Sequence, residues 1–275
     1  MRLAGALAAL LAAAAAVPAG GAAQGAETVR FAVKGDWGDG TPAQAAVTGR
    51  MCAEYRRSPF AFVLTTGDNF YRPNGTATAA NFTRPERCLT AVGVRWRAAW
   101  GNHDVAGTST ADVLGSPRRF YAVVSGPMRL LVLYGNDPDD PGQLRFLRRQ
   151  LAAATEPVRI VAFHQPIRTA GLHPPAEDAR RLWEPLLRRG RVTLVLQGHN
   201  HLYERLEVGG MTYVTTGGGS AQLYPCVRFP EGLRRCALEH HFLAVNVSRS
   251  RVSVRAVTSR GTTIERVVLR ARPPA

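Results

Sequence analysis

Five apolar, strand-like segments of this chain each end at a residue that can bind a metal ion. Their length and their β-branched or aromatic content are typical of buried strands. The segments are 29–35, 60–64, 94–100, 158–163 and 192–196, and they end at Asp36, Asp68, Asn102, His164 and the pair His199/His201. One such ending is ordinary turn chemistry, because Asp and Asn favour turns. Five in one chain predict an α/β fold with a ligand site at the carboxyl ends of its strands.

The stretch Gly67-Asp68-Asn69-Phe70-Tyr71 after the second segment suits a shared metal ligand. The two oxygen atoms of the Asp68 carboxylate can each bind a different cation. If the loop curls into one helical turn, the phenol of Tyr71 returns to the same point. The alternatives are an ordinary turn at Asp68 and a packed surface aromatic at Tyr71.

The hydrophobic pattern of the rest of the chain predicts a single folded domain over residues 27–275. Helices are expected at 41–57, 84–92, 142–153 and 176–189, further strands near 119–125 and 128–134, and an all-β part from Met211 onward. The sequence has no internal repeat and no stretch with the composition of an interdomain linker. The length of the range 27–275 is enough for one large α/β domain with a full core.

The first residues have the composition of a secretory signal. Arg2 precedes an Ala/Leu-rich run from Leu3 to Val17, and small residues follow as far as Ala23. We expect a signal peptide over 1–23 and a secreted or extracytoplasmic protein, with an uncleaved anchor as the alternative. No later segment offers about twenty consecutive apolar residues, so no membrane span is expected after cleavage.

The four cysteines agree with export. An even number of cysteines in a secreted chain favours two disulfides, for which three pairings are possible. We favour Cys52–Cys88 and Cys226–Cys236 because each closes a short local loop. Free buried thiols are the alternative.

The formal net charge is +15, and Lys34 is the only lysine. A positive field of this size attracts anionic substrates and also nucleic acids or anionic surfaces. The arginines are scattered, however, and form no long basic run. A compositional bias of the genome explains them as well as a partner does, so we predict no specific nucleic-acid partner.

The motifs taken together resemble those of the purple acid phosphatases, which are calcineurin-like metallophosphoesterases. They are Asp36-x-Gly38, Gly67-Asp68-x-x-Tyr71, Gly101-Asn102-His103-Asp104, Val161-x-x-His164 and Gly198-His199-x-His201. The first two motifs are especially similar to the small, tartrate-resistant kind. The resemblance implies a four-layer α/β/β/α sandwich of two mixed sheets flanked by helices, with the catalytic domain over 27–275.

The resemblance also implies two metal sites that share one carboxylate. One ion would be held by Asp36, Asp68, Tyr71 and His201, and the other by Asp68, Asn102, His164 and His199. The first set gathers three anionic ligands once the phenol ionises, so it suits Fe(III). The second set has neutral imidazoles and an amide, so it suits a divalent ion such as Fe(II), Zn or Mn. Gly38 stands where other calcineurin-like enzymes carry a histidine ligand, and Tyr71 can replace that ligand.

Three further residues are candidates for catalysis. In the implied mechanism a metal-bound hydroxide attacks the phosphoryl group, and the leaving group needs a proton or an electrostatic partner. His103 is the best candidate for that role, and Asp104 could orient it, although many relatives have Glu there. His173 follows His164 by nine residues, as a second substrate-facing histidine does in the small tartrate-resistant enzymes. An exposed loop histidine is the alternative for His173.

We therefore expect an exported, monomeric, binuclear metallophosphatase that hydrolyses phosphate monoesters of small molecules or phosphoproteins. The same ligands would serve a phosphodiesterase or a nucleotide pyrophosphatase, because the ligand motifs do not reveal the pocket lining. A non-catalytic binding or surface protein would be marked by a lost ligand, and none is missing. The segment 134–141 is short where mammalian relatives carry a long insertion, so the site should be open.

Overall fold

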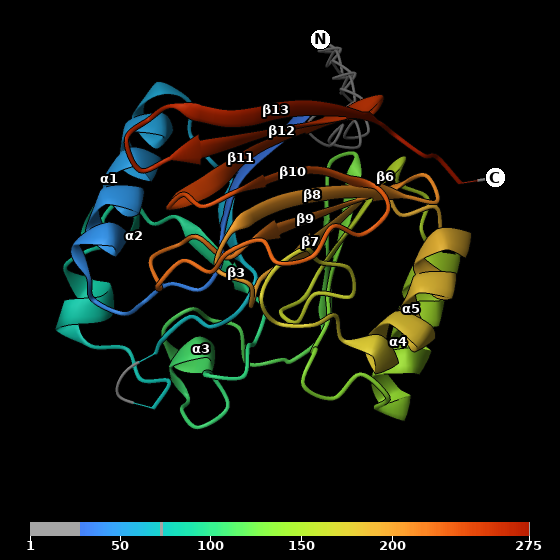
Figure 1. The fold of residues 1–275 in the computed structure, drawn as a ribbon, viewed down its shortest axis with the longest axis horizontal. Coiled ribbons are helices and arrows are strands. Elements are labelled where there is room, and N and C mark those ends of the chain that lie inside the picture. The colour runs from blue at the N-terminus through green and yellow to red at the C-terminus, as the bar shows by residue number, and fades with distance from the viewer. Residues whose placement is uncertain (1–27, 72–73, 275) are drawn as a thin grey trace, which may run out of the picture.

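The computed structural model describes residues 28–71 and 74–274, so the predicted signal peptide over 1–23 lies outside the described residues. Two β-sheets pack face to face, and helices cover the outer face of each sheet (Figure 1). The predicted four-layer sandwich is confirmed. Helices α1 and α2 lie on one side of the sheets and α4 and α5 on the other.

Both sheets are mixed. The six-stranded sheet has the order β13-β12-β11-β1-β2-β3, and the seven-stranded sheet has the order β10-β8-β9-β7-β6-β5-β4. The strands are β1 (Thr28–Lys34), β2 (Phe62–Thr65), β3 (Arg95–Ala98), β4 (Tyr121–Ser125), β5 (Met128–Val132), β6 (Val158–Ala162), β7 (Leu194–Gln197), β8 (Tyr203–Val208), β9 (Met211–Thr216), β10 (Leu233–Ala237), β11 (His241–Ser248), β12 (Arg251–Thr258) and β13 (Thr263–Arg270). In the first sheet β1, β2 and β3 run parallel, and in the second β5, β6, β7 and β9 do. Their carboxyl ends therefore meet along one edge of the sandwich.

The helices form for reasons visible in their sequences. They are α1 (Pro42–Arg57), η1 (Ala79–Thr83), α2 (Arg87–Thr90), α3 (Ser109–Asp112), α4 (Pro141–Ala152) and α5 (Glu177–Arg189). Helix α1 begins with Pro42 after Thr41, whose hydroxyl accepts a hydrogen bond from the Gln44 amide. Helix α4 begins in the same way, with Asp140 as the cap before Pro141.

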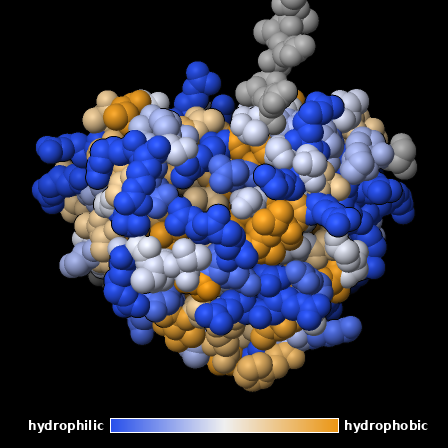
Figure 2. Space-filling view, turned by 90° about the horizontal axis from the view of Figure 1, so that it is seen from above, coloured by the Kyte–Doolittle hydropathy of each residue, from blue (hydrophilic) through white to orange (hydrophobic). Residues whose placement is uncertain are grey.

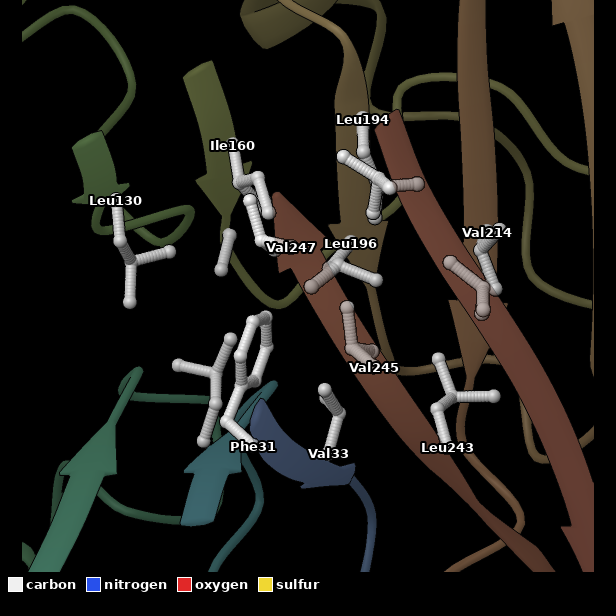
Figure 3. Close-up of a cluster of buried hydrophobic side chains, with 14 of the residues drawn as sticks. Phe31, Val33, Leu130, Ile160, Leu194, Leu196, Val214, Leu243, Val245 and Val247 are labelled. Atoms are coloured by element: carbon white, nitrogen blue, oxygen red, sulfur yellow. The ribbon is translucent and has the colours of Figure 1, made fainter. Parts of the chain in front are cut away.

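The main core lies between the two sheets. Phe31 and Val33 of β1, with Leu243 of β11, point toward Leu130 and Leu196 of the second sheet (Figure 3). Two smaller clusters lie under the helices, one between α1 and the first sheet and one between α4, α5 and the second sheet. Because side chains alternate along each strand, every central strand contributes to two of these three clusters. This double burial explains why the strands read as continuous apolar runs.

The sequence pattern located most elements and missed a few. The strand β8 was not predicted. The helix expected at 84–92 is shorter: it is α2, Arg87–Thr90, and the π-helical turn η1 precedes it. Strand β8 carries a buried Glu204 and a partly buried Arg205 among its apolar residues, and this mixed composition hides the strand signal. The favoured disulfides Cys52–Cys88 and Cys226–Cys236 are both present.

One face of the molecule is mostly hydrophilic. Figure 2 shows a face on which hydrophilic side chains dominate and hydrophobic ones form small separate areas. In residues 28–71 and 74–274, no helix combines the length and the apolar content that crossing a bilayer requires.

A buried ion pair fastens helix α2 to the end of β1. Lys34 Nζ lies 2.7 Å from a carboxylate oxygen of Glu86, and both side chains are fully buried. The same Glu86 oxygen accepts hydrogen bonds from Gln44 and Thr48. Lys34 Nζ also lies 3.7 Å from the centroid of the Trp37 ring, within cation–π distance. Burial lowers the pKa of Lys34, and Glu86 opposes that shift.

Removing one partner of this pair should destabilise the fold. Glu86→Gln leaves the buried ammonium of Lys34 without its counter-charge, so we expect the free energy of unfolding in urea to fall by about 3–5 kcal/mol. Asp178→Asn is the control, because it breaks the exposed pair with Arg181 and should cost less than about 1 kcal/mol. Equal losses for the two variants would contradict a special role for burial.

Candidate metal centre

The predicted ligands converge where strands of both sheets end. Asp36 follows β1, Asp68 follows β2, and His164 and His199 follow β6 and β7 of the other sheet. The backbone joins these ends directly: the Asp36 amide donates to Gly67 (3.1 Å) and the Gly198 amide donates to the His164 carbonyl (2.9 Å). The site therefore lies across the junction between the two sheets.

Three of the ligand residues have backbone conformations that non-glycine residues seldom adopt. The φ angles are 57° at Asp36, 47° at Asp68 and 66° at His199. Each such residue costs of order 1–3 kcal/mol, and positions of this kind concentrate at functional sites. A glycine packs tightly against one of them: a Cβ at Gly101 would lie 2.1 Å from Asp68 Oδ1. These loops are shaped to present their side chains at the cost of local stability.

One group of ligand atoms surrounds His164. Its Nε2 lies 3.3 Å from Asp68 Oδ2, 3.1 Å from Asn102 Oδ1 and 3.2 Å from His199 Nδ1. Ligand atoms of Asp68, His164 and His199 all lie within 4.8 Å of one another. Such a set of carboxylate, amide and imidazole donors fits a divalent cation.

A second group surrounds His201. Its Nε2 lies 3.0 Å from the Tyr71 hydroxyl and 3.4 Å from Asp36 Oδ1, and the Tyr71 hydroxyl lies 3.4 Å from the same oxygen. This trio of carboxylate, phenol and imidazole has the harder, more anionic donors of the two groups. The members of the two groups are residues that the sequence motifs named as metal ligands, with Asp68 placed in the group around His164, and their binding of metal ions stays a prediction.

Backbone carbonyl groups fix how two of the histidines face the centre. His164 Nδ1 lies 2.9 Å from the Thr66 carbonyl, and His201 Nδ1 lies 2.7 Å from the Gln222 carbonyl. A carbonyl can only accept, so each Nδ1 carries the proton, and in the neutral ring each Nε2 presents a lone pair to the centre. Metal-binding histidines are oriented in this way in proteins.

The electrostatics of the site favour a cation at its centre. Burial alone would raise the pKa of Asp68, but His164 and His103 together hold it below its ordinary value. Burial and the charge of His164 lower the pKa of His199 to about 3, so this ring stays neutral and able to bind a metal. Burial and the carboxylates of Asp36 and Asp68 raise the pKa of Tyr71. Its phenol therefore ionises near neutral pH only when a strong cation is beside it.

Asp104 does not hold His103 as the sequence suggested. Its carboxylate is buried and accepts hydrogen bonds from the Asn69 amide (2.9 Å), the Asn69 side chain (3.0 Å) and the Gly101 amide (2.7 Å). Asn69 follows Asp68 and Gly101 precedes Asn102, so Asp104 ties two ligand loops together. Among the described residues, the hydrogen bonds of the Asp104 carboxylate go to these two loops and none goes to His103, so the structure indicates a role in fixing the loops.

His103 and His173 both lie at the rim of the centre. His103 is half-exposed, its Nε2 lies 4.0 Å from Asp68 Oδ2, and its ring centroid is 4.7 Å from that of Tyr71. The ring of His173 lies 4.4 Å from that of His199. Burial and the neighbouring His201 lower the pKa of His173. Both rings therefore border the predicted metal ligands.

Two residues of the site gave no usable sequence signal. Tyr224 stacks on His201 with ring centroids 4.2 Å apart and meets His173 at 5.3 Å. It comes from the loop between β9 and β10, two residues before Cys226, which is linked by a disulfide to Cys236 of β10, and it belongs to no motif. Asn69 lies inside a motif but is not one of the predicted ligands; its Oδ1 accepts a hydrogen bond from Trp37 Nε1, and its Nδ2 donates to Asp104. The only sequence hint to the role of Asn69 was its position next to the predicted ligand Asp68.

Comparison with known proteins identifies relatives of this chain. Residues 29–203 match the family model described as calcineurin-like phosphoesterase. Tartrate-resistant acid phosphatase type 5 of Rattus norvegicus is 28% identical over 305 residues, which is 90% of this chain and 92% of that protein. The human protein of the same name is 28% identical over 302 residues, 89% of this chain and 92% of its own. Purple acid phosphatase 7 of Arabidopsis thaliana is 26% identical over 70% of each chain.

Solved structures share the fold. The purple acid phosphatase PPD1 from yellow lupin superposes with a TM-score of 0.74 at 16% identity, over 88% of this chain and 53% of its own. GAP50, described as the anchor in the inner membrane complex of Plasmodium, also has a TM-score of 0.74, at 18% identity over 89% of each chain.

Removing the Asp104 carboxylate should loosen the metal centre. Asp104→Ala leaves the amides of Asn69 and Gly101 without an acceptor, so we expect metal affinity to fall by about 10–100-fold. Metal content after dialysis against a graded chelator measures this. His103→Gln is the matched control and should retain metal as the wild type does, and a wild-type affinity in Asp104→Ala would show that the loops hold their positions without this carboxylate.

Proposed function

Because this chain belongs to the calcineurin-like phosphoesterase family, we propose that it is an exported phosphatase that uses two metal ions to hydrolyse phosphate monoesters. It is an acid phosphatase-like hydrolase, and metal-dependent cleavage of phosphate esters is the activity of its family. The proposal adds to this the two-ion centre, the ligands, the monoester substrate and the export.

The observation that supports the proposal is the pair of donor groups around His164 and His201, with Asp68 3.3 Å from His164. The sets Asp36, Asp68, Tyr71, His201 and Asp68, Asn102, His164, His199 supply four protein ligands to each ion. The chemistry of the donors supports Fe(III) in the first set, since it offers two carboxylates and a phenol. It supports a divalent Fe, Zn or Mn ion in the second, where only the shared Asp68 is anionic.

Two metal ions held side by side would activate a water molecule as the nucleophile and stabilise charge on the phosphoryl oxygens. The residues of the chain prepare this centre. Asp68 is positioned by the His103 amide, which donates to its Oδ1 at 2.9 Å, and Asp36 by the His199 amide, which lies 3.0 Å from each of its oxygens. Both carboxylates are thus fixed in orientation before any ion binds.

His103 is proposed to donate a proton to the leaving oxygen. Its half-exposed ring faces Asp68 from the rim, so it reaches the solvent side of a bound phosphate. His173 and Tyr224 lie beside the rings of His199 and His201, where they would position the ester group. The export proposal is supported by the two disulfides, which persist in oxidising compartments.

The shared carboxylate should be indispensable. Asp68→Ala removes a ligand from both ions, so we expect both metals to be lost together and turnover to disappear. Metal content by elemental analysis and hydrolysis of 4-nitrophenyl phosphate measure the two effects. Retention of one metal with partial activity would contradict the bridging role.

Tyr71 should give the metal-loaded protein its colour. A phenolate bound to Fe(III) produces a broad charge-transfer band in the visible spectrum, and Tyr71→Phe should abolish it while the fold is kept. The far-ultraviolet circular dichroism of the variant is the control. A band that survives the substitution would assign the chromophore to another ligand.

The role of His103 can be tested with leaving groups of different basicity. His103→Ala should lower kcat/KM for an alkyl phosphate by about 10²–10⁴-fold, because an alkoxide needs a proton to leave. The loss should be smaller for 4-nitrophenyl phosphate, whose phenolate leaves more readily. An equal loss for both esters would indicate that His103 binds the substrate and does not transfer a proton.

A further inference from the structure

A second cleft, of about 320 Å³, opens between the edges of the two sheets. Strand β3 is the last strand of the first sheet and β4 is the last strand of the second. The Tyr121 hydroxyl of β4 donates to the Ala98 carbonyl of β3 at 3.2 Å and joins the two edges. Arg97 and Arg118 line the cleft with Tyr121, Val123 and the turn 115–117, and none of these residues is a proposed metal ligand.

Arg97 lies beside an apolar core residue on the face of β3 that is turned toward the second sheet. It is paired in register with Leu64 of β2, and Leu64 belongs to the core between the sheets. Residues paired across neighbouring strands point to the same face, so Arg97 also points into the space between the sheets. On the facing strand, Tyr121 and Val123 pack against the same core. A guanidinium group therefore lies at the open end of the hydrophobic core.

The charge of this group is not balanced by the protein. The Nε atom of Arg97 is buried and has no hydrogen-bond partner among the described residues. Within residues 28–71 and 74–274, neither Arg97 nor Arg118 forms an ion pair with a carboxylate. A buried charged donor without an acceptor is costly, and an anion bound in the cleft would remove that cost.

We propose that this edge cleft binds a small organic anion with a phosphate-like head. The planar fork of a guanidinium matches two oxygens of such a head, and Arg97 and Arg118 supply two forks at one cleft. Tyr121 and Val123 supply an apolar wall for the body of the ligand. The volume lies at the lower end of the range of small-molecule sites, so it holds one small ligand.

Phenylphosphonate is the probe, because it has a phosphate-like head and an apolar ring and its carbon–phosphorus bond resists hydrolysis. Calorimetric titration of the metal-loaded protein at low salt measures affinity and stoichiometry. We expect the wild type to bind one more equivalent of phenylphosphonate, detected as heat, than the Arg97→Gln or Arg118→Gln variant does at the same ligand concentration. Each substitution should weaken the cleft site by about tenfold or more, as expected for the loss of a hydrogen bond to a charged group.

Three controls make the result decisive. Arg249→Gln removes an exposed charge from the turn between β11 and β12 and should leave both affinity and stoichiometry unchanged. Arg97→Lys keeps the charge without the fork and should bind with intermediate affinity, which also serves if the glutamine variant fails to fold. Hydrolysis of 4-nitrophenyl phosphate should be equal in all arginine variants.

Asp68→Ala separates this proposal from the proposed function. That variant should lose the equivalent bound at the metal centre and keep the equivalent bound in the cleft. If phenylphosphonate binds with the same stoichiometry and affinity to the wild type, Arg97→Gln and Arg118→Gln, the cleft proposal is overturned, whatever happens at the metal centre.

Discussion

The hydrogen bond from His164 Nδ1 to the Thr66 carbonyl joins the two sheets at the place where their strands end. It crosses from β6 of one sheet to the loop after β2 of the other. The same bond places the proton of His164 on Nδ1 and leaves Nε2 facing Asp68 and Asn102. The predicted metal centre depends on this junction, because neither sheet alone brings a complete set of donors to one point.

A chain of buried contacts connects this junction with the outer helices. The Lys34–Glu86 pair lies beneath Trp37, the indole of Trp37 donates to Asn69 at 3.2 Å, and Asn69 donates in turn to Asp104. Each member touches the next, and most are fully buried. The loops that present the ligands are thus supported from below by polar groups whose hydrogen bonds are largely satisfied, and this rigid support offsets the unfavourable backbone angles at Asp36 and Asp68.

Much of this architecture was readable from the sequence, because the central strands are apolar on both faces and stop at polar residues. The positions of Asp36, Asp68 and His164 followed from that pattern. The role of Asp104 did not, since its neighbour in sequence, His103, turns toward solvent while Asp104 turns inward. Tyr224 could not be placed either, because its loop depends on contacts with distant residues. Strand β8 was missed because charged residues, one of them the buried Glu204, interrupt its apolar pattern.

The burial of Lys34 has a chemical consequence for handling the protein. Since the chain contains no other lysine and this one is fully buried, amine-directed reagents should find no reactive ε-amino group on the folded surface. Modification of Lys34 would require helix α2, with Glu86 at its start, to separate from β1, so the rate of acylation of Lys34 would report how often that part of the core opens. Lys34 is therefore an internal probe of local unfolding in this part of the protein.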